Sequence, residues 1–560
     1  MRAWGAWRAI GSPSSSACTS AREACSAGSS STRGRSRPDD GTTNRLIRSR
    51  FSNFIKGKAS VNELMRSAGF SLSRLNVVCL SFLTLVIELL IISCYALPVM
   101  KSRYHIITFG CQMNKSDSER METLLKGVGL ESTDDQEEAD VILVNTCSVR
   151  QSAEDRVYGL VKGFKKLKKK KPELIIGVTG CLPGRDRDGA LKRTLEIVDL
   201  YFPTKEMGQL PRWIGEIRPE LVNSTDAVED YLKIKPEYHT KRQAFVSIQT
   251  GCNKFCTYCV VPFARGLEKN RPVADIMEEI QDLAAHGCVE VTLLGQTVNS
   301  YQAPDAENFS EGNPYEDHFA KLLWEVNQVE GINRLHFTAP HPLHMTDEVI
   351  DAMTLPAHLN FIHLPVQAGS DDVLRRMNRR YTSKQFLDVV KRLKAKIPEL
   401  AIGTDIVVGF CGESPEQFDE TVELFKEVDF DISYTARYST RSGTAAWRAF
   451  NDDVSHEEKK RRWEVLQKLM EESVYKKNQK FVGEVVSVLV DRHEPPKVTD
   501  EMLTMPEKIQ ELMAQQPGTC YGQSREMKLT RFAGGEEYVG EIVEVRVTRA
   551  DKWILEGEIV

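Results

Sequence analysis

Short apolar runs alternate with amphipathic stretches along most of this chain, and this alternation predicts strands separated by helices. The first strands are expected over residues 104–110, 141–146 and 174–180. Helical periodicity fills the two intervals between them, over residues 116–128 and 153–168. Each interval is long enough for one helix and its loops, so the three strands can be parallel neighbours. The pattern therefore predicts an open parallel α/β sheet domain over residues 102–220.

The same pattern continues through the middle of the chain, after a polar connecting stretch at residues 211–238. Six more strands are expected, over residues 244–249, 290–294, 334–339, 361–366, 401–408 and 432–438. Six successive strand–helix units predict a parallel, partly open barrel, which we assign to residues 238–475. In such barrels the chemistry lies at the carboxyl ends of the strands.

The pattern changes after a charged helical stretch at residues 457–480. Apolar and polar residues then alternate with a period of two over residues 481–491, 525–532 and 536–560, which predicts a small antiparallel β-barrel in residues 478–560. Residues 494–518 predict a long loop that contains a helix at residues 507–516. The fold class is thus α/β: an open parallel sheet domain, a central partial (βα)6 barrel and a C-terminal antiparallel β-barrel.

Residues 1–99 follow a different pattern. The first 37 residues hold ten serines with little apolar periodicity, and an apolar run at residues 77–99 is interrupted by Glu88. Three interpretations are open: a membrane anchor, a cleaved or targeting segment, or an upstream extension that the folded protein does not need. A carboxylate near the centre of a membrane span costs about 2.5–3.5 kcal/mol. Because Met100 directly precedes the first strand, we favour the extension and expect no membrane association.

Charge is distributed unevenly along the 560 residues. The formal net charge is -5, but residues 1–99 carry 13 basic and 5 acidic side chains, which leaves 61 basic against 74 acidic in the rest. A nucleic-acid partner must therefore be bound by local basic surface. The lysine-rich run at residues 165–171 is either a solvated helix end or a phosphate contact. A hydrophobic content of 41% excludes a chain that is disordered throughout.

Thirteen cysteines, an odd number scattered over a long chain, favour a reducing compartment or a metal site over a disulfide framework. Cys111, Cys147 and Cys181 each follow one of the first three strands. Since the carboxyl ends of parallel strands meet at one edge of a sheet, these thiols are expected to converge. Three thiolates suit a [4Fe–4S] cluster with one iron lacking a protein ligand. Any one of them alone could equally be a buried apolar residue.

A second group of cysteines has the spacing CxxxCxxC directly after the strand at residues 244–249. It consists of Cys252, Cys256 and Cys259. A structural zinc site usually needs four ligands, and no fourth one lies nearby in the sequence. Three thiolates on one loop instead suit a second [4Fe–4S] cluster whose open iron can bind a small chelating molecule.

Five sequence segments in these regions resemble sequences of the methylthiotransferases of the radical S-adenosylmethionine superfamily. They are FGCQMNKSDSE (109–119), NTCSVR (145–150), GCNKFCTYCVVPFARG (251–266), LGQTVNSY (294–301) and LPVQAGSDDVLRRMNR (364–379). Within that family they look like the MiaB type, the tRNA-2-methylthio-N6-dimethylallyladenosine synthases. The sister enzymes that modify a ribosomal protein usually have Pro-Lys-Asn where this chain has Gln112-Met113-Asn114. The resemblance covers residues 102–560, with departures at Cys411, where Pro is typical, and at Ala368, where Ser is frequent.

The resemblance implies a tRNA-modifying enzyme that methylthiolates C2 of N6-dimethylallyladenosine next to the anticodon. Its cofactors would be two [4Fe–4S] clusters, held by the two sets of three cysteines, and S-adenosylmethionine as radical source and methyl donor. Glycines allow close backbone approach at the strand ends. We therefore expect cofactor contacts from Gly295, Gln296, Gly409, Gly412 and Glu413. No acid–base dyad stands out, because the cofactors carry the chemistry.

The C-terminal β-barrel resembles the TRAM domain that ends this family, and such barrels bind RNA through basic and aromatic side chains. The RNA-binding candidates are Arg525, Lys528, Arg531 and Phe532. His341 and His344 are expected to be loop structure, Cys288 a core residue and Cys520 a loop residue.

The implied partners are a tRNA carrying N6-dimethylallyladenosine and an electron donor such as flavodoxin or ferredoxin, with a cytoplasmic monomer expected. Two alternatives remain. One keeps the chemistry but changes the substrate to another modified adenosine or a ribosomal-protein aspartate. The other is an iron–sulfur RNA-binding or regulatory protein without catalysis.

Overall fold

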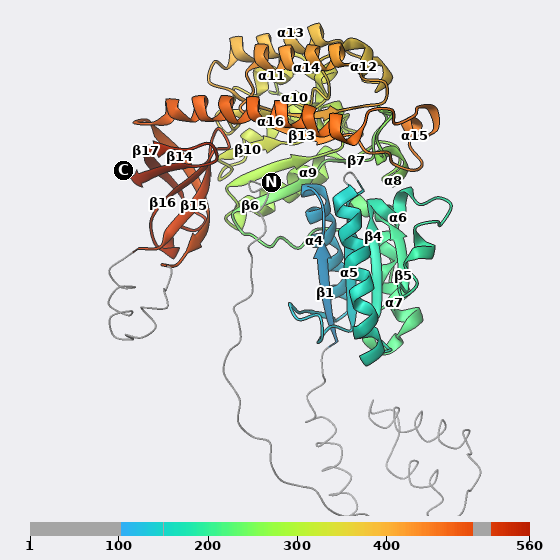
Figure 1. Ribbon diagram of the computed structural model, residues 1–560. Coiled ribbons are helices and arrows are strands. Elements are labelled where there is room, and N and C mark those ends of the chain that lie inside the picture. The colour runs from blue at the N-terminus through green and yellow to red at the C-terminus, as the bar shows by residue number, and fades with distance from the viewer. Residues whose placement is uncertain (1–101, 149–150, 497–516) are drawn as a thin grey trace, which may run out of the picture. The chain divides into compact units, whose positions relative to one another are not determined.

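The computed structural model describes residues 102–148, 151–496 and 517–560 (Figure 1). The apolar run at residues 77–99 and the helix expected at residues 507–516 lie outside these ranges. Within them, no helix is both long enough and apolar enough to cross a membrane.

The first part of the structure is a five-stranded, fully parallel sheet in the order β2-β1-β3-β4-β5. The strands are β1 (Arg103–Thr108), β2 (Glu131–Ser132), β3 (Val141–Thr146), β4 (Ile175–Gly180) and β5 (Leu200–Pro203). The helices are α4 (Gln112–Gly127), α5 (Gln151–Lys170), α6 (Cys181–Arg185) and α7 (Leu210–Ile217). Strands β3 and β4 are buried throughout because separate apolar clusters cover the two faces of the sheet. The predicted open parallel sheet is confirmed.

Two three-stranded parallel sheets form the central part, in the orders β10-β9-β6 and β11-β12-β13. Their strands are β6 (Gln243–Ser247), β9 (Glu290–Leu294), β10 (Arg334–Phe337), β11 (Phe361–His363), β12 (Ala401–Val408) and β13 (Ile432–Arg437). A parallel bridge between Leu335 and His358 joins the two sheets. The six strands therefore follow one another as the predicted partial barrel requires.

Helices cover one face of these strands. They are α8 (Val261–Ala264), α9 (Val273–Ala285), α10 (His318–Asn327), α11 (Asp347–Ala352), α12 (Asp371–Arg376), α13 (Ser383–Lys396), α14 (Pro415–Val428), α15 (Ala445–Ala449) and α16 (His456–Asn478). Side chains from alternate strand positions, such as Ile402 and Ile406, pack with them in one large apolar core. A short antiparallel pair, β7 (Gln249–Thr250) and β8 (Lys269–Asn270), flanks the loop after β6.

The C-terminal part is a closed five-stranded barrel in the order β14-β15-β16-β18-β17. Its strands are β14 (Val485–Glu494), β15 (Thr519–Ser524), β16 (Leu529–Ala533), β17 (Ile542–Ala550) and β18 (Leu555–Ile559). The barrel is antiparallel except between β16 and β18, which pair in parallel. Strand β15 was not predicted, since its sequence TCYGQS has few strong strand formers. Cys520 accordingly lies in this strand and is fully buried, so its predicted place on a loop is wrong.

Candidate active site

The first cysteine set lies at the carboxyl edge of the N-terminal sheet. Cys111 precedes α4, Cys147 follows β3 and Cys181 begins α6, directly after β4. Because β1, β3 and β4 are neighbours, this edge gathers the three residues. Gly110 permits the close approach: a Cβ atom there would lie only 3.0 Å from Cβ of Cys147.

Two buried asparagines hold these loops together. The Asn114 side chain donates to Oδ1 of Asn145 at 3.1 Å and to the carbonyl of Thr146 at 3.2 Å. Asn145 returns a hydrogen bond to the carbonyl of Asn114 at 2.7 Å, and the Cys111 thiol lies 3.5 Å from Oδ1 of Asn114. Sequence analysis did not single out either asparagine, although both lie within its quoted motifs. They fix the positions of two loops that each carry a cysteine.

The second set lies on the loop after β6, and a hydrogen-bond partner approaches each sulfur. The backbone N–H groups of Lys254 and Val261 donate to Sγ of Cys252 and Cys259, each at 3.4 Å. Nη1 of Arg379 donates to Sγ of Cys256, also at 3.4 Å. Such donors stabilise negative charge on sulfur, as the ligands of an iron–sulfur cluster require.

Sequence reasoning also did not single out Arg379, which contacts the second cysteine set. It is buried, donates from Nε to the hydroxyl of Tyr381 at 3.0 Å and from Nη2 to the carbonyl of Pro365 at 3.3 Å. Its guanidinium also lies 5.1 Å from the centre of the Tyr381 ring. A buried cation without a carboxylate among these contacts is costly. A cluster held by anionic thiolates beside it would offset that cost.

The donor chemistry of both cysteine sets fits iron–sulfur clusters, whose irons are held by thiolates. Within the described residues, no three His, Cys, Asp or Glu side chains converge on one point as the ligands of one ion would. In a [4Fe–4S] cluster each thiolate binds a different iron, so the sulfurs need not converge in that way. Burial raises the pKa of the Cys252 thiol and raises that of Cys259 to about 12. These thiols would therefore become thiolates at neutral pH through metal binding.

Of the residues expected to contact a cofactor, Gly295 and Gln296 lie beside the second cysteine set. Oγ1 of Thr297 is 3.3 Å from Sγ of Cys252, and the Thr297 N–H donates to Oε1 of Gln249 at 3.2 Å. A Cβ atom on Gly295 would lie 3.0 Å from the same Gln249 oxygen. The loop after β9 is thus held closely against the loop that carries the cysteines.

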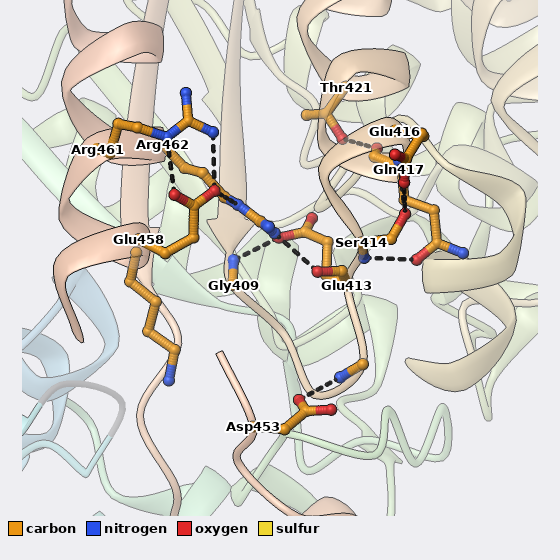
Figure 2. A network of polar contacts seen from close by, with 12 residues as sticks. Gly409, Glu413, Ser414, Glu416, Gln417, Thr421, Asp453, Glu458, Arg461 and Arg462 are labelled. Carbon is orange, nitrogen blue, oxygen red and sulfur yellow. Dashed lines mark hydrogen bonds and ion pairs between the residues drawn. The ribbon is translucent and has the colours of Figure 1, made fainter. Parts of the chain in front are cut away.

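The other three expected residues, Gly409, Gly412 and Glu413, lie in the loop between β12 and α14. Arg462 of α16 contacts Glu413 in this loop (Figure 2). Oε2 of Glu413 accepts from the Gly409 N–H at 2.5 Å and from Nη1 of Arg462 at 2.7 Å. The Gly412 N–H donates to Asp453 at 2.7 Å. Gly409 has φ 69, and a Cβ atom there would collide with the Lys459 side chain.

The second carboxylate oxygen of Glu413 has a different environment. Oε1 is buried and has no hydrogen-bond partner within the part of the chain that the structure describes. Burial raises the pKa of Glu413, with the Gly409 N–H and Arg462 opposing the shift. A buried acceptor of this kind requires a partner, which a ligand N–H or O–H group can supply.

The segments that carry the two cysteine sets adjoin where α6, which begins with Cys181, packs on α8, which begins two residues after Cys259. A Cβ atom on Gly184 would collide with the carbonyl of Ala264, so only glycine allows this approach. Arg265, which follows α8, forms a buried ion pair with Asp117 of α4 at 2.5 Å, and the hydroxyl of Tyr231 donates to the same carboxylate at 2.6 Å. Burial raises the pKa of the Cys181 thiol, and the neighbouring Arg265 charge opposes that shift.

The four predicted RNA contacts do not form one exposed surface. Arg525 donates to the carbonyls of Pro356 and His358 at 2.7 and 2.6 Å, and Lys528 pairs with Asp431 at 3.2 Å. Phe532 is buried in the core of the C-terminal barrel. The first two residues instead attach that barrel to the central one, and the burial of Lys528 and Phe532 does not fit direct RNA contact. Arg531 keeps a 41% exposed side chain, although it pairs with Glu556.

Three secondary predictions can be compared with the structure. His341 lies in a loop, where its Nδ1 accepts from the Leu343 N–H at 3.3 Å, and Cys288 is a core residue, both as predicted. The lysine-rich end of α5 contacts neighbouring acids, since Lys165 and Lys168 pair with Glu196 and Asp199. This arrangement favours a solvated helix end.

Comparison with known proteins places the chain in a family. The model of the radical SAM superfamily matches residues 246–425, and that of the uncharacterized protein family UPF0004 matches residues 103–203. A tRNA-2-methylthio-N(6)-dimethylallyladenosine synthase of Caldicellulosiruptor saccharolyticus is 41% identical over 82% of this chain and 92% of its own length. The synthase of the same name from Clostridium tetani is 39% identical over 82% and 97%. The methyltransferase TsrM from Kitasatospora setae superimposes with TM-score 0.47 at 12% identity, over 62% of this chain and 74% of TsrM.

The match to the radical SAM family and the curated relatives define a radical S-adenosylmethionine enzyme. S-Adenosylmethionine and [4Fe–4S] clusters are the cofactors that this class implies. More narrowly, the chain belongs to the family of tRNA-2-methylthio-N(6)-dimethylallyladenosine synthases. A substrate other than tRNA is not favoured by these relatives.

Proposed function

We propose that this protein methylthiolates C2 of N6-dimethylallyladenosine in tRNA, next to the anticodon. The observation that carries the proposal is that three cysteines follow β1, β3 and β4 and three lie on the loop after β6, while α6 and α8, which adjoin these segments, pack on each other. One set would serve radical formation and the other sulfur insertion.

Cys252, Cys256 and Cys259 would hold the cluster that binds S-adenosylmethionine, and Cys111, Cys147 and Cys181 would hold the second cluster. When bound, these cofactors supply the electron, the radical, the sulfur and the methyl group of the reaction. The protein fixes their positions: Arg379 and the backbone N–H groups bind the sulfurs of the CxxxCxxC loop. Preorganised donors of this kind need no rearrangement when charge develops.

The S-adenosylmethionine contacts would come from the two loops at the carboxyl rim of the barrel. Gly295 and Gln296 lie against the loop that carries Cys252, and we propose that they line the cofactor. Glu413 would accept a hydrogen bond through Oε1, while Arg462 holds its other oxygen. Gly409 and Gly412 would act by allowing the turn that positions Glu413, since both have positive φ.

For the tRNA, we propose a contact surface on the C-terminal barrel centred on Tyr521. Strand pairing places Arg492 of β14 and Arg531 of β16 directly opposite Tyr521 of β15, so the three side chains form a row on one face. The Arg492 guanidinium lies 4.2 Å from the centre of the Tyr521 ring. Guanidinium and aromatic planes in a row are suited to stacking with unpaired bases.

Further partners follow from the reaction. An electron donor such as flavodoxin or ferredoxin would reduce the cluster, and a monomer would suffice because both cysteine sets lie in one chain. A cytoplasmic location is proposed because tRNA and reduced thiols are found there.

Substitution of one cysteine from each set tests the proposal. In the reconstituted enzyme, Cys111→Ala should abolish methylthiolation of tRNA but retain cleavage of S-adenosylmethionine, whereas Cys256→Ala should abolish both. Cys288→Ala, a change at a buried cysteine outside both sets, is the matched control and should retain both activities. Mass spectrometry of tRNA nucleosides measures methylthiolation, and mass spectrometry of 5′-deoxyadenosine measures cleavage of S-adenosylmethionine. Equal loss in the two ligand variants would contradict the division of roles.

A further inference from the structure

Residue alternation in β11, β12 and β13 identifies the side chains that point to the inner face of the partial barrel. Ile362, Ile402 and Ile406 pack in the apolar core beneath the helices. Because successive side chains of a strand point to opposite faces, His363 and Asp405 point to the inner face. Register then places Tyr434 of β13 directly opposite Asp405, on the same face.

His363 contacts both Asp405 and Tyr434. Nε2 of His363 lies 3.1 Å from Oδ2 of Asp405, and the rings of His363 and Tyr434 are 5.6 Å apart between centres. The Asp405 side chain is nevertheless 42% exposed and that of His363 19%. The Asp405 carboxylate is thus accessible to a ligand, although His363 already pairs with it.

The inner face is closed at the amino ends of the strands. There Arg334 is 1% exposed, pairs with Glu290 at 2.6 Å and donates to the carbonyls of Gln523 and Ser524 of the C-terminal barrel. His336, the next inward residue of β10, is also buried. Accessible polar groups therefore lie in the carboxyl half, on the side of the cysteines.

A short chain of contacts connects the three residues with the CxxxCxxC loop. Pro365, two residues after His363, accepts through its carbonyl from Nη2 of Arg379 at 3.3 Å. Nη1 of the same arginine reaches Sγ of Cys256. A planar group held by the three residues would thus lie near the site of radical formation.

We propose that His363, Asp405 and Tyr434 recognise the adenine ring of the substrate. The proposal rests on the proposed function and names the recognition site within it. N6-Dimethylallyladenine retains one exocyclic N–H group, which the Asp405 carboxylate accepts. The Tyr434 ring stacks on the base, and His363 orients the carboxylate. A charge-assisted hydrogen bond and one aromatic face together select a planar heterocycle with an N–H donor.

The hydrogen bond is tested by removing each of its partners in turn. Binding of two anticodon stem–loop RNAs is measured with the cluster-loaded enzyme. One RNA carries N6-dimethylallyladenosine, and the other carries the same base with an additional N6-methyl group and so lacks the N–H. The unmodified protein should bind the second RNA about tenfold or more weakly, the loss expected for a hydrogen bond to a charged group. Asp405→Ala should bind the two RNAs within twofold of each other.

The proposal would be overturned if Asp405→Ala discriminated between the two RNAs as strongly as the unmodified protein does. A purely structural role of Asp405 would give that result, because its loss would lower the affinities for both RNAs together. Tyr434→Leu should weaken the binding of both RNAs by about tenfold, which is the loss expected when one base can no longer stack on an aromatic ring. Ser433→Ala is the matched control, since Ser433 is buried on the other face of the same strand. An affinity for Tyr434→Leu equal to that of the control would also contradict the proposal. Iron content and unfolding temperature verify folding, and methylthiolation by the unmodified protein separately decides the proposed function.

Discussion

Individual side chains in the central barrel are kept neutral by burial. His358 is 1% exposed; its Nδ1 lies 2.7 Å from the carbonyl of Leu359, and its Nε2 has no hydrogen-bond partner in the described residues. Burial lowers the pKa of His358 to about 4, with the positive charge of Arg525 acting in the same direction. The pKa of His336 is lowered to about 3, mainly by burial. The folded state therefore favours the unprotonated form of both rings.

This preference predicts that acid lowers the free energy of unfolding. An unfolded histidine has a pKa of about 6.5, so below this pH the unfolded state binds more protons than the folded state. The free energy of unfolding should fall by about 1.4 kcal/mol per pH unit for His358 alone between roughly pH 6.5 and 4. Denaturant unfolding at several pH values measures the slope, which should become shallower in His358→Asn. An unchanged slope would contradict the assignment.

At the level of elements, the short helices α6 and α8 determine how closely the two cysteine sets approach. Neither helix exceeds five residues, so their packing and not their intrinsic stability sets their position. The close contact at Gly184 leaves no room for a side chain.

Gly184→Ala should therefore separate α6 from α8. We expect a loss of about 1–3 kcal/mol in the free energy of unfolding from overpacking. Methylthiolation should fall more than cleavage of S-adenosylmethionine, because only the former needs both cysteine sets. Gly159→Ala is the control: Gly159 is exposed in α5 with nothing within 4 Å of an added Cβ, and alanine favours a helix. Equal effects of the two substitutions on both readouts would refute this role of the contact.

At the scale of the whole molecule, buried polar contacts join the parts of the described chain. Asp117 and Arg265 connect the N-terminal sheet domain with the central barrel, and Lys528 and Arg525 connect the C-terminal barrel to it. Burial alone would raise the pKa of Asp431, but the charges of Lys528 and Lys477 lower it. Two of these connections, Asp117–Arg265 and Asp431–Lys528, are ion pairs, so removing one partner leaves a charge uncompensated.

Asp117→Asn should destabilise the folded protein strongly. The Arg265 charge would remain buried without its carboxylate, at a cost of about 3–5 kcal/mol in the free energy of unfolding. Glu196→Gln, which removes the exposed pair with Lys165, should cost about 1 kcal/mol or less. Denaturant unfolding of both variants measures the difference. Similar losses in the two would show that the buried pair contributes no more than a surface pair.

Much of the fold could be read from local pattern. The strands β3, β9 and β12 match their predicted limits, because buried parallel strands are continuous apolar runs between clear turns. Strand β15 was not predicted, because its sequence has few strong strand formers and it pairs with its neighbours only in the closed barrel. Helix α4 begins at Gln112, earlier than the apolar periodicity predicted, because its first turn carries the polar residues of the cysteine loop.

The sequence by itself determined the class of chemistry, since six cysteines at fixed spacings define two ligand sets whatever the details of packing. Only the tertiary structure decided which charged and aromatic side chains are accessible. It showed that Lys528 and Phe532 are buried, that Arg379 reaches Cys256, and that His363 and Asp405 meet on the inner face. The CxxxCxxC spacing, and the place of the other three cysteines after successive apolar runs, are local properties of the chain. Exposure and contact depend on segments that are distant in sequence and become neighbours only on folding.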